Sequence, residues 1–135
     1  MSTITAPADY QRYADAFNAR DYDAVFDFYG PAPRMAFFGI EITTRQQLRD
    51  FYGFLHQYVV ETVEVERIAV SDTLCAVEGI VRIEATQDLT REALDANGME
   101  QFFPIAKGEV QVMRQYIHYH LADGKIASVG CALVP

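Results

Sequence analysis

The sequence of 135 residues has no tryptophan, only two cysteines and an excess of acidic residues. Its 11 Lys and Arg against 19 Asp and Glu give a net charge of −8 without any basic stripe, so no nucleic-acid partner is expected. No apolar run approaches the roughly 20 residues that a membrane-spanning helix needs. The opening stretch, MSTITAPADYQRY, lacks the basic and apolar regions of a secretory signal. These absences predict a cytoplasmic protein with no membrane partner.

The sequence also lacks the short motifs that carry known chemistry. It has no nucleophile elbow, phosphate loop, zinc motif or dinucleotide fingerprint, so no cofactor is expected. Cys75 and Cys131 lie in alternating apolar segments without Cys-x-x-Cys spacing, and we expect both to be reduced and buried. His118 and His120 could chelate a metal, but strand alternation places both on the outer face of a sheet. No metal site is therefore predicted.

Hydrophobic residues and tyrosines are plentiful. Half of the residues are hydrophobic, and eight are tyrosines whose hydroxyls need hydrogen-bond partners wherever they are buried. The length and the apolar content predict a single domain over residues 1–135 with a packed core.

The first half of the chain has the periodicity of helices. Apolar residues at helical spacing predict helices over residues 8–19, 22–29 and 44–58. Asp21 is expected to cap the second helix, and Thr43 or Thr44 the third. The prolines of GPAP at residues 30–33 are expected to stop the second helix, before a short strand at 34–38 and a turn at 39–42.

From residue 60 the period changes to 2, which predicts long antiparallel strands over residues 60–70, 74–87, 108–121 and 125–134. In the second of these the odd-numbered residues form the core face, where Gly79 either bends the strand or makes room for a bound group. Residues 88–107 interrupt the pattern with a short helix at 90–97, and so long a connection is interpreted as a lid or a partner surface. Helices followed by a long antiparallel sheet indicate an α+β fold.

This order of elements resembles the NTF2-like superfamily. The stretches QRYADAFNARDYDAV at residues 11–25 and LRDFY at 48–52 are similar to its ketosteroid isomerase branch, and DGKI at 123–126 resembles the SnoaL-like polyketide cyclases. The resemblance implies an α+β cone in which three N-terminal helices pack on a strongly curved mixed or antiparallel sheet around one pocket. It also implies a homodimer formed through the outer face of the sheet.

The resemblance further implies a catalytic role for Tyr13, as hydrogen-bond donor to a developing enolate oxygen. Tyr29 and Tyr52 fall where some members place two supporting phenols, and such a chain polarises its terminal donor. The two catalytic carboxylates of the isomerases fall on Phe37 and Ile117, neither of which can replace a carboxyl group. Steroid isomerisation by the family mechanism is therefore not expected.

A general base is thus missing from the predicted pocket. His118 is the one nominee, provided that a β-bulge turns it inward. Glu61, Glu64 and Glu66 are interpreted as a charge run that pairs with Arg82 across the sheet.

The expected ligand is small, largely apolar or aromatic, and carries one carbonyl or phenolate oxygen. We predict a cofactor-independent isomerase, cyclase or dehydratase that acts beside a carbonyl. A non-catalytic binding module and a structural dimerisation domain with a filled cone remain alternatives, because one fold hosts many functions. The residues predicted to line the pocket are Tyr13, Phe17, Tyr29, Phe37, Tyr52, Val77, Val81, Met113, Gln115, Ile117, Val129 and Cys131.

Overall fold

The computed structural model describes residues 2–37 and 39–135, apart from the side chain of Phe37. The order of helices and strands predicted from the sequence is confirmed. The elements are α1 (Pro7–Asn18), α2 (Tyr22–Asp27), β1 (Tyr29–Phe37), β2 (Ile40–Ile42), α3 (Arg45–Leu55), β3 (Val59–Val70), β4 (Leu74–Ala85), α4 (Arg91–Ala96), β5 (Val110–Ala122) and β6 (Lys125–Leu133).

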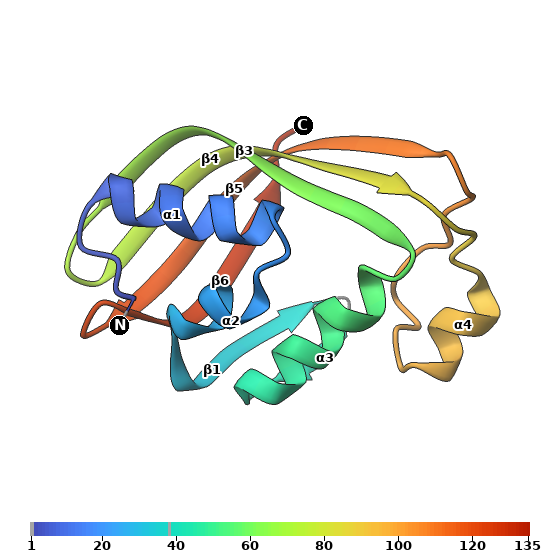
Figure 1. The fold of residues 1–135 in the computed structure, drawn as a ribbon, viewed down its shortest axis with the longest axis horizontal. Coiled ribbons are helices and arrows are strands. Elements are labelled where there is room, and N and C mark those ends of the chain that lie inside the picture. Colours follow the sequence, from blue (N-terminus) through green and yellow to red (C-terminus); the bar gives the residue numbers. More distant parts are fainter. Residues whose placement is uncertain (1, 38) are drawn as a thin grey trace.

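The strands form one curved sheet in the order β2-β1-β6-β5-β4-β3. The sheet is mixed, because β1 runs parallel to β6 while the other neighbouring strands are antiparallel. Figure 1 shows the sheet curving around α1, α2 and α3, with α4 set apart at one end. This is the predicted cone. No helix of the described residues is long and apolar enough to cross a membrane.

The helices form where the caps and apolar spacing predict them. The side chains of Asp21 and Thr44 accept hydrogen bonds from the backbone N–H groups three residues on, at the starts of α2 and α3. Each helix buries one apolar stripe against the concave face of the sheet. In α1 the buried residues are Tyr10, Tyr13, Ala14 and Phe17, and in α3 they are Leu48, Phe51 and Leu55.

Three predicted boundaries are wrong. Helix α2 ends at Asp27 and α3 at Leu55, and the GPAP segment lies inside β1 instead of ending a helix. The two prolines are tolerated because β2 pairs only with the last residues of β1, from Met35. The parallel pairing of β1 with β6 also shifts register between Tyr29 and Arg34, so few ladder hydrogen bonds are required of the prolines.

The edge strand β3 has a bulge that explains Gly79. The pairing of β3 with β4 shifts register between Val65 and Arg67. A Cβ atom added at Gly79 would lie 3.1 Å from the carbonyl oxygen of Glu64. The glycine therefore accommodates the close approach of the neighbouring backbone, and the ligand alternative is not needed.

Candidate functional site

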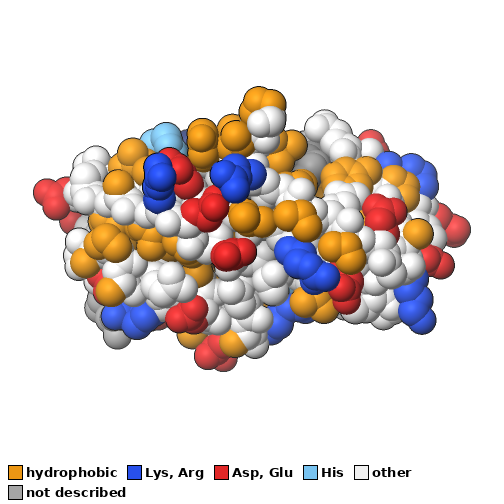
Figure 2. Space-filling model, turned by 90° about the horizontal axis from the view of Figure 1, so that it is seen from above, with side chains coloured by type: hydrophobic (Ala, Val, Ile, Leu, Met, Phe, Trp, Pro, Cys, Tyr) orange, Lys and Arg blue, Asp and Glu red, His pale blue; other side chains and the backbone are white. Residues whose placement is uncertain are grey.

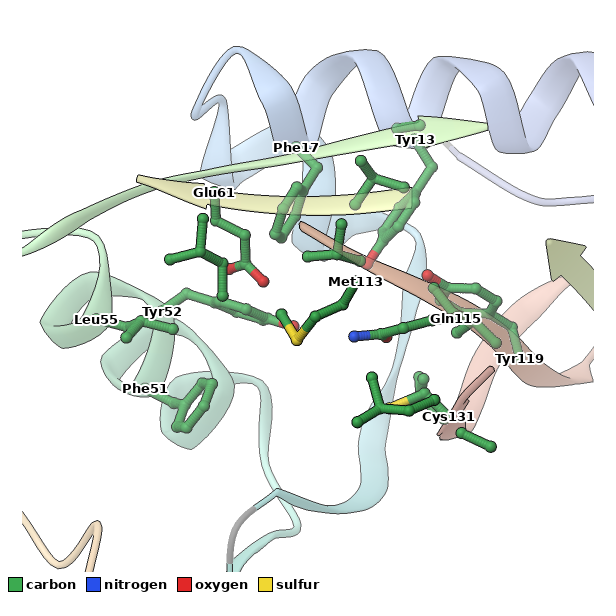
Figure 3. A pocket seen from close by; sticks show the side chains of 18 of the residues that line it. Tyr13, Phe17, Phe51, Tyr52, Leu55, Glu61, Met113, Gln115, Tyr119 and Cys131 are labelled. Carbon is green, nitrogen blue, oxygen red and sulfur yellow. The ribbon is translucent and has the colours of Figure 1, made fainter. Parts of the chain in front are cut away.

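A cavity of about 390 Å³ lies between the helices and the concave face of the sheet. Figure 3 shows side chains from α1, α3 and strands β3 to β6 converging on it. Phe102 and Phe103, whose rings stack 4.7 Å apart, complete the wall from the segment that follows α4. The predicted long connection thus contributes to the cavity wall.

Most of the residues predicted to line the pocket do line this cavity. They are Tyr13, Phe17, Tyr52, Val81, Met113, Gln115, Ile117, Val129 and Cys131. Tyr29 and Val77 are buried in the core and are not among the described residues that line the cavity, so their predicted place in the lining is wrong. The side chain of Phe37 lies outside the described part of the chain, and its place in the lining stays a prediction.

Two pairs of hydroxyl groups occupy one end of the cavity, which we call the phenol end. The hydroxyls of Tyr13 and Tyr29 lie 2.6 Å apart, and those of Tyr10 and Tyr119 lie 2.8 Å apart. The rings of Tyr13 and Tyr119 meet edge to face, with centroids 5.7 Å apart. Tyr29 lies behind Tyr13 and can donate to its oxygen, which leaves the Tyr13 hydrogen for an acceptor in the cavity.

Sequence reasoning missed the second of these pairs. Tyr10 lies about one helical turn before Tyr13 on α1, and Tyr119 shares its strand face with Ile117 on β5. Helical spacing places Tyr10 on the same face as Tyr13, and strand alternation places Tyr119 on the inner face with Ile117, so the signal was available.

The buried phenols remain protonated at ordinary pH. Burial, which disfavours the charged form, raises the pKa of Tyr13, Tyr29, Tyr10 and Tyr119 well above the ordinary value of 10.0. These hydroxyls can therefore donate hydrogen bonds at neutral pH, but they cannot serve there as phenolate bases.

The other end of the cavity carries a carboxylate, and we call it the carboxylate end. Glu61 extends from β3 into the cavity (Figure 3), and its side chain is only 15% exposed. Its Oε1 lies 2.9 Å from Nε2 of His56, whose side chain is 2% exposed. The Nδ1 atom of His56 in turn lies 2.7 Å from the hydroxyl of Tyr22. Three elements thus contribute to one line of hydrogen bonds.

The interpretation of Glu61 as part of a surface charge run is wrong. Arg82 pairs instead with Glu84, at 2.7 Å. Glu61 is opposite Ile83 in the sheet, and both residues face the cavity. The sequence did hold a signal, because Glu61 is a lone acid at a position that alternates with Val59 and Val63 on the inner face.

Tyr52 lies at the carboxylate end. Its ring centroid is 5.4 Å from that of His56 and 5.3 Å from that of Phe17. Burial and the nearby Tyr29 and Glu61 raise the pKa of Tyr52 well above its ordinary value, so it also stays a neutral donor.

His118 lies outside the cavity. Its side chain is exposed on the outer face of β5, opposite Ala76 on one side and Gly130 on the other. The register between β4 and β5 is continuous from Leu74 to Glu84, so no bulge turns His118 inward. The nomination of His118 as the base is therefore withdrawn.

The two cysteines differ in their surroundings. Cys75 is buried, and burial raises its pKa to about 11. Cys131 is exposed and also lines the cavity, which places it near an opening, so the expectation that it is buried is wrong. Both are free thiols. Among the described residues, no group of three or more His, Cys, Asp or Glu side chains could hold a metal ion.

Comparison with known proteins identifies the family. The family model of the SnoaL-like domain matches residues 10–129, so the chain belongs to the SnoaL-like family. None of the curated proteins matches the sequence.

Solved structures share the fold at low sequence identity. A candidate polyketide cyclase from Silicibacter sp. TM1040 is 20% identical, with a TM-score of 0.74 over 93% of this chain and 85% of that one. A second, from Xanthomonas campestris pv. campestris, is 21% identical, with a TM-score of 0.71 over 90% and 84%. A protein of ketosteroid isomerase-like fold from Catenulispora acidiphila, solved with trimethylamine, is 11% identical, with a TM-score of 0.69 over 95% and 86%. These similarities show the NTF2-like fold, which hosts many chemistries.

Proposed function

We propose that this protein is a cofactor-independent enzyme that moves a proton beside the carbonyl group of a small, largely apolar molecule. The observation that carries the proposal is the polarity of one cavity, which has neutral phenol donors at one end and a carboxylate at the other. Isomerisation, aldol-type cyclisation and dehydration all begin with such a transfer.

Glu61 is the proposed general base. Its carboxylate takes a proton from the carbon next to the carbonyl, the C–H bond breaks, and its electron pair becomes that of an enolate. A carboxylate in a mainly apolar cavity is suited to this task, because the side chain of Glu61 is largely shielded from solvent. Glu61 takes over the role that the sequence had left to His118.

Tyr13 is the proposed donor to the oxygen of the ligand. As the enolate forms, negative charge moves onto that oxygen, and a hydrogen bond aimed there stabilises the charge. Tyr29, 2.6 Å behind Tyr13, polarises the donor. The Tyr10–Tyr119 pair lies beside it and offers a second phenol to the same end of the cavity.

The cavity favours neutral ligands over anions. Its described lining includes no Lys, Arg or His, and Glu61 is the lone charged residue among them. An anionic ligand would meet the negative charge of Glu61 in apolar surroundings, which is unfavourable. The volume of about 390 Å³ is at the small end of ligand pockets and suits a molecule of one to a few rings.

A probe of enolisation tests the proposal. The neutral bicyclic ketone 2-tetralone has acidic C–H groups beside its carbonyl, and NMR follows their exchange for deuterium in D2O. We expect the protein to accelerate this exchange and Glu61→Gln to lower the acceleration by at least about 100-fold. Glu64→Gln is the matched control, since Glu64 is exposed on the same strand.

The outcomes separate enzyme from binding module. Binding of 2-tetralone without accelerated exchange would favour the non-catalytic alternative. The structural alternative expects a filled cone, and the open cavity disfavours it. If Tyr13→Phe left both binding and exchange unchanged, Tyr13 would not be the donor.

We also propose a homodimer formed through the outer face of the sheet. Val112 and Tyr116 on β5 are 64% and 47% exposed there. Figure 2 shows hydrophobic side chains gathered beside a histidine along one edge of the molecule, near side chains of both charges. The outer face carries charges of both signs, such as Arg114 and Glu66, which lie 3.4 Å apart. A face with both signs can complement the same face of a second copy about a twofold axis.

Sedimentation velocity tests the dimer. We expect the protein to sediment as a dimer and Val112→Asp to sediment as a monomer, with Ala122→Asp as an exposed control at the end of the same strand. A monomeric parent protein would contradict the proposal. The single domain over residues 1–135 and the cytoplasmic location stay predictions.

A further inference from the structure

A line of hydrogen bonds leads from the cavity to the surface at the carboxylate end. Glu61 belongs to β3, His56 follows the last residue of α3, and Tyr22 begins α2. We infer that His56 and Tyr22 are positioning residues that fix the Glu61 carboxylate for proton transfer, an inference that rests on the proposed role of Glu61. Neither His56 nor Tyr22 lines the cavity among the described residues.

With Glu61 as a carboxylate and His56 as a neutral imidazole, the donors and acceptors in this line have one consistent order. A carboxylate can only accept, so the bond of 2.9 Å to Glu61 requires a hydrogen on Nε2 of His56. A neutral imidazole then has a lone pair on Nδ1, and that atom accepts from the Tyr22 hydroxyl 2.7 Å away. Tyr22 thereby selects the tautomer in which His56 can donate to Glu61.

The imidazole is also held by the rings around it. Tyr22 stacks on His56 with an interplanar angle of 15° and centroids 5.9 Å apart. The ring of Tyr52 lies 5.4 Å away, and Phe17 meets the imidazole edge to face at 5.7 Å. With a side chain only 2% exposed, His56 is enclosed by close-packed neighbours.

Backbone clamps fix the segment that carries His56 and Glu61. The Arg20 guanidinium donates to the carbonyl oxygens of His56, at 3.1 Å, and of Val59, at 2.8 Å. The Asn18 amide donates to the carbonyl of Val63 and accepts from its N–H, at 2.9 and 2.8 Å. Glu61 therefore lies midway between two clamped residues of β3.

Arg20 itself adopts a conformation that serves this clamp. Its φ of 61° is in the left-handed region, which usually favours glycine after a helix. An arginine there keeps the two hydrogen bonds to the turn between α3 and β3, which a glycine could not make. The connection between α1 and α2 thus holds the carboxylate end in place.

One oxygen of the Glu61 carboxylate is therefore hydrogen-bonded to the protein, and the other has no such partner among the described residues. Because His56 holds Oε1, Oε2 is the oxygen that can meet a C–H group of the ligand. A fixed carboxylate loses less freedom on reaching the transition state, and a misplacement of about 1 Å can cost about 100-fold in rate. The arrangement explains why a buried histidine is placed where no ligand reaches it.

Nitrogen NMR tests the tautomer without any ligand. With three histidines in the chain, ¹⁵N-histidine labelling gives few signals, and His118 and His120 are the exposed ones. We expect His56 to have its hydrogen on Nε2 at pH 7.5, and Tyr22→Phe to give a mixture of tautomers. An Nε2 without a hydrogen in the parent protein would overturn the inference, because His56 could then not donate to Glu61.

Exchange of 2-tetralone tests the consequence. His56→Leu has similar volume without a donor, and we expect it to slow exchange by about 100-fold while affinity changes less than about threefold. His56→Gln places an amide N–H near the position of Nε2 and should restore exchange to within about tenfold. Tyr22→Phe, the variant least disturbing to folding, should slow exchange about three- to tenfold.

These variants separate the two proposals. If Glu61→Gln leaves exchange unchanged, the proposed function is wrong and the inference falls with it. If Glu61→Gln abolishes exchange while His56→Leu and Tyr22→Phe do not slow it, Glu61 is the base and the positioning role is wrong. If His56→Leu does not fold, the tautomer of His56 and the rate of exchange in Tyr22→Phe decide the matter.

Discussion

The two ends of the cavity present polar groups of different kinds. At the phenol end, Tyr13 and Tyr29 form one of two hydroxyl pairs, and each hydroxyl in a pair can donate or accept. At the carboxylate end, Glu61 can only accept, and His56 must supply the hydrogen. The phenol end is uncharged and adaptable, while the carboxylate end has a fixed polarity.

This difference changes what a substitution should cost. Removing one neutral hydroxyl from a pair deprives its partner of a hydrogen bond, which lowers the free energy of unfolding by about 1 kcal/mol. Removing His56 leaves a largely buried carboxylate without its donor, which is several times more costly. The stability of variants at each end measures this difference.

The largest effect is expected from alkali, and it concerns the phenols. Below about pH 10 both states hold their phenol protons, so the stability from burial is fully present. Above it the unfolded chain loses protons that the folded state retains, and the free energy of unfolding falls by about 1.4 kcal/mol per pH unit for each phenol. The phenols whose pKa is raised by burial are Tyr10, Tyr13, Tyr22, Tyr29, Tyr52 and Tyr119.

Urea unfolding between pH 8 and pH 11 measures this effect. Tyr29→Phe should make the fall in unfolding free energy with pH less steep, by the contribution of one phenol. Tyr116→Phe, at an exposed position, should leave the slope unchanged. Stability that is constant up to pH 11 would show that the phenols ionise equally in both states.

The next effect is the loss of His56. We expect His56→Ala to lower the free energy of unfolding by about 3 kcal/mol at pH 7, because the Glu61 carboxylate loses its donor and the core loses a ring. Urea unfolding measures it, with His120→Ala as an exposed control expected to change stability by less than about 0.5 kcal/mol. If His56→Ala cost no more unfolding free energy than His120→Ala, the carboxylate end would not be the more costly end to change.

The smallest effect is expected at the phenol end at neutral pH. Tyr29→Phe removes one hydroxyl of a buried pair and should cost about 1 kcal/mol of unfolding free energy at pH 7. The same urea series measures it. A cost as large as that of His56→Ala would mean that losing a phenol hydrogen bond destabilises the fold as much as losing the donor to Glu61.

The inner faces of α1 and β5 could be predicted because they depend on local spacing. Tyr13 and Phe17 are four residues apart on one helix, so their common face follows from the helical period. In the same way, alternation along β5 places Met113, Gln115 and Ile117 on the inner face.

The carboxylate end depends on features without a local period. His56 and Glu61 are five residues apart across the end of a helix and the start of a strand. Tyr22 joins them from another helix, 34 residues before His56. A run of three glutamates resembles a solvated strand, and this resemblance outweighed the alternation that places Glu61 on the inner face, opposite Ile83. The path of β1 through its prolines was missed for a similar reason, since it depends on which partner strands are present.

The hydrogen bonds between Asn18 and Val63 have a consequence for association between molecules. Strand β3 is an outer strand of the sheet, and the exposed N–H and C=O groups of an outer strand can recruit a strand from another chain and begin aggregation. The Asn18 amide occupies both backbone groups of Val63, as the backbone of a neighbouring strand would. Beyond that point the bulge after Val65 interrupts the regular spacing of the edge. A foreign strand therefore finds no continuous template along β3, and a single asparagine on α1 helps to keep separate molecules from joining their sheets.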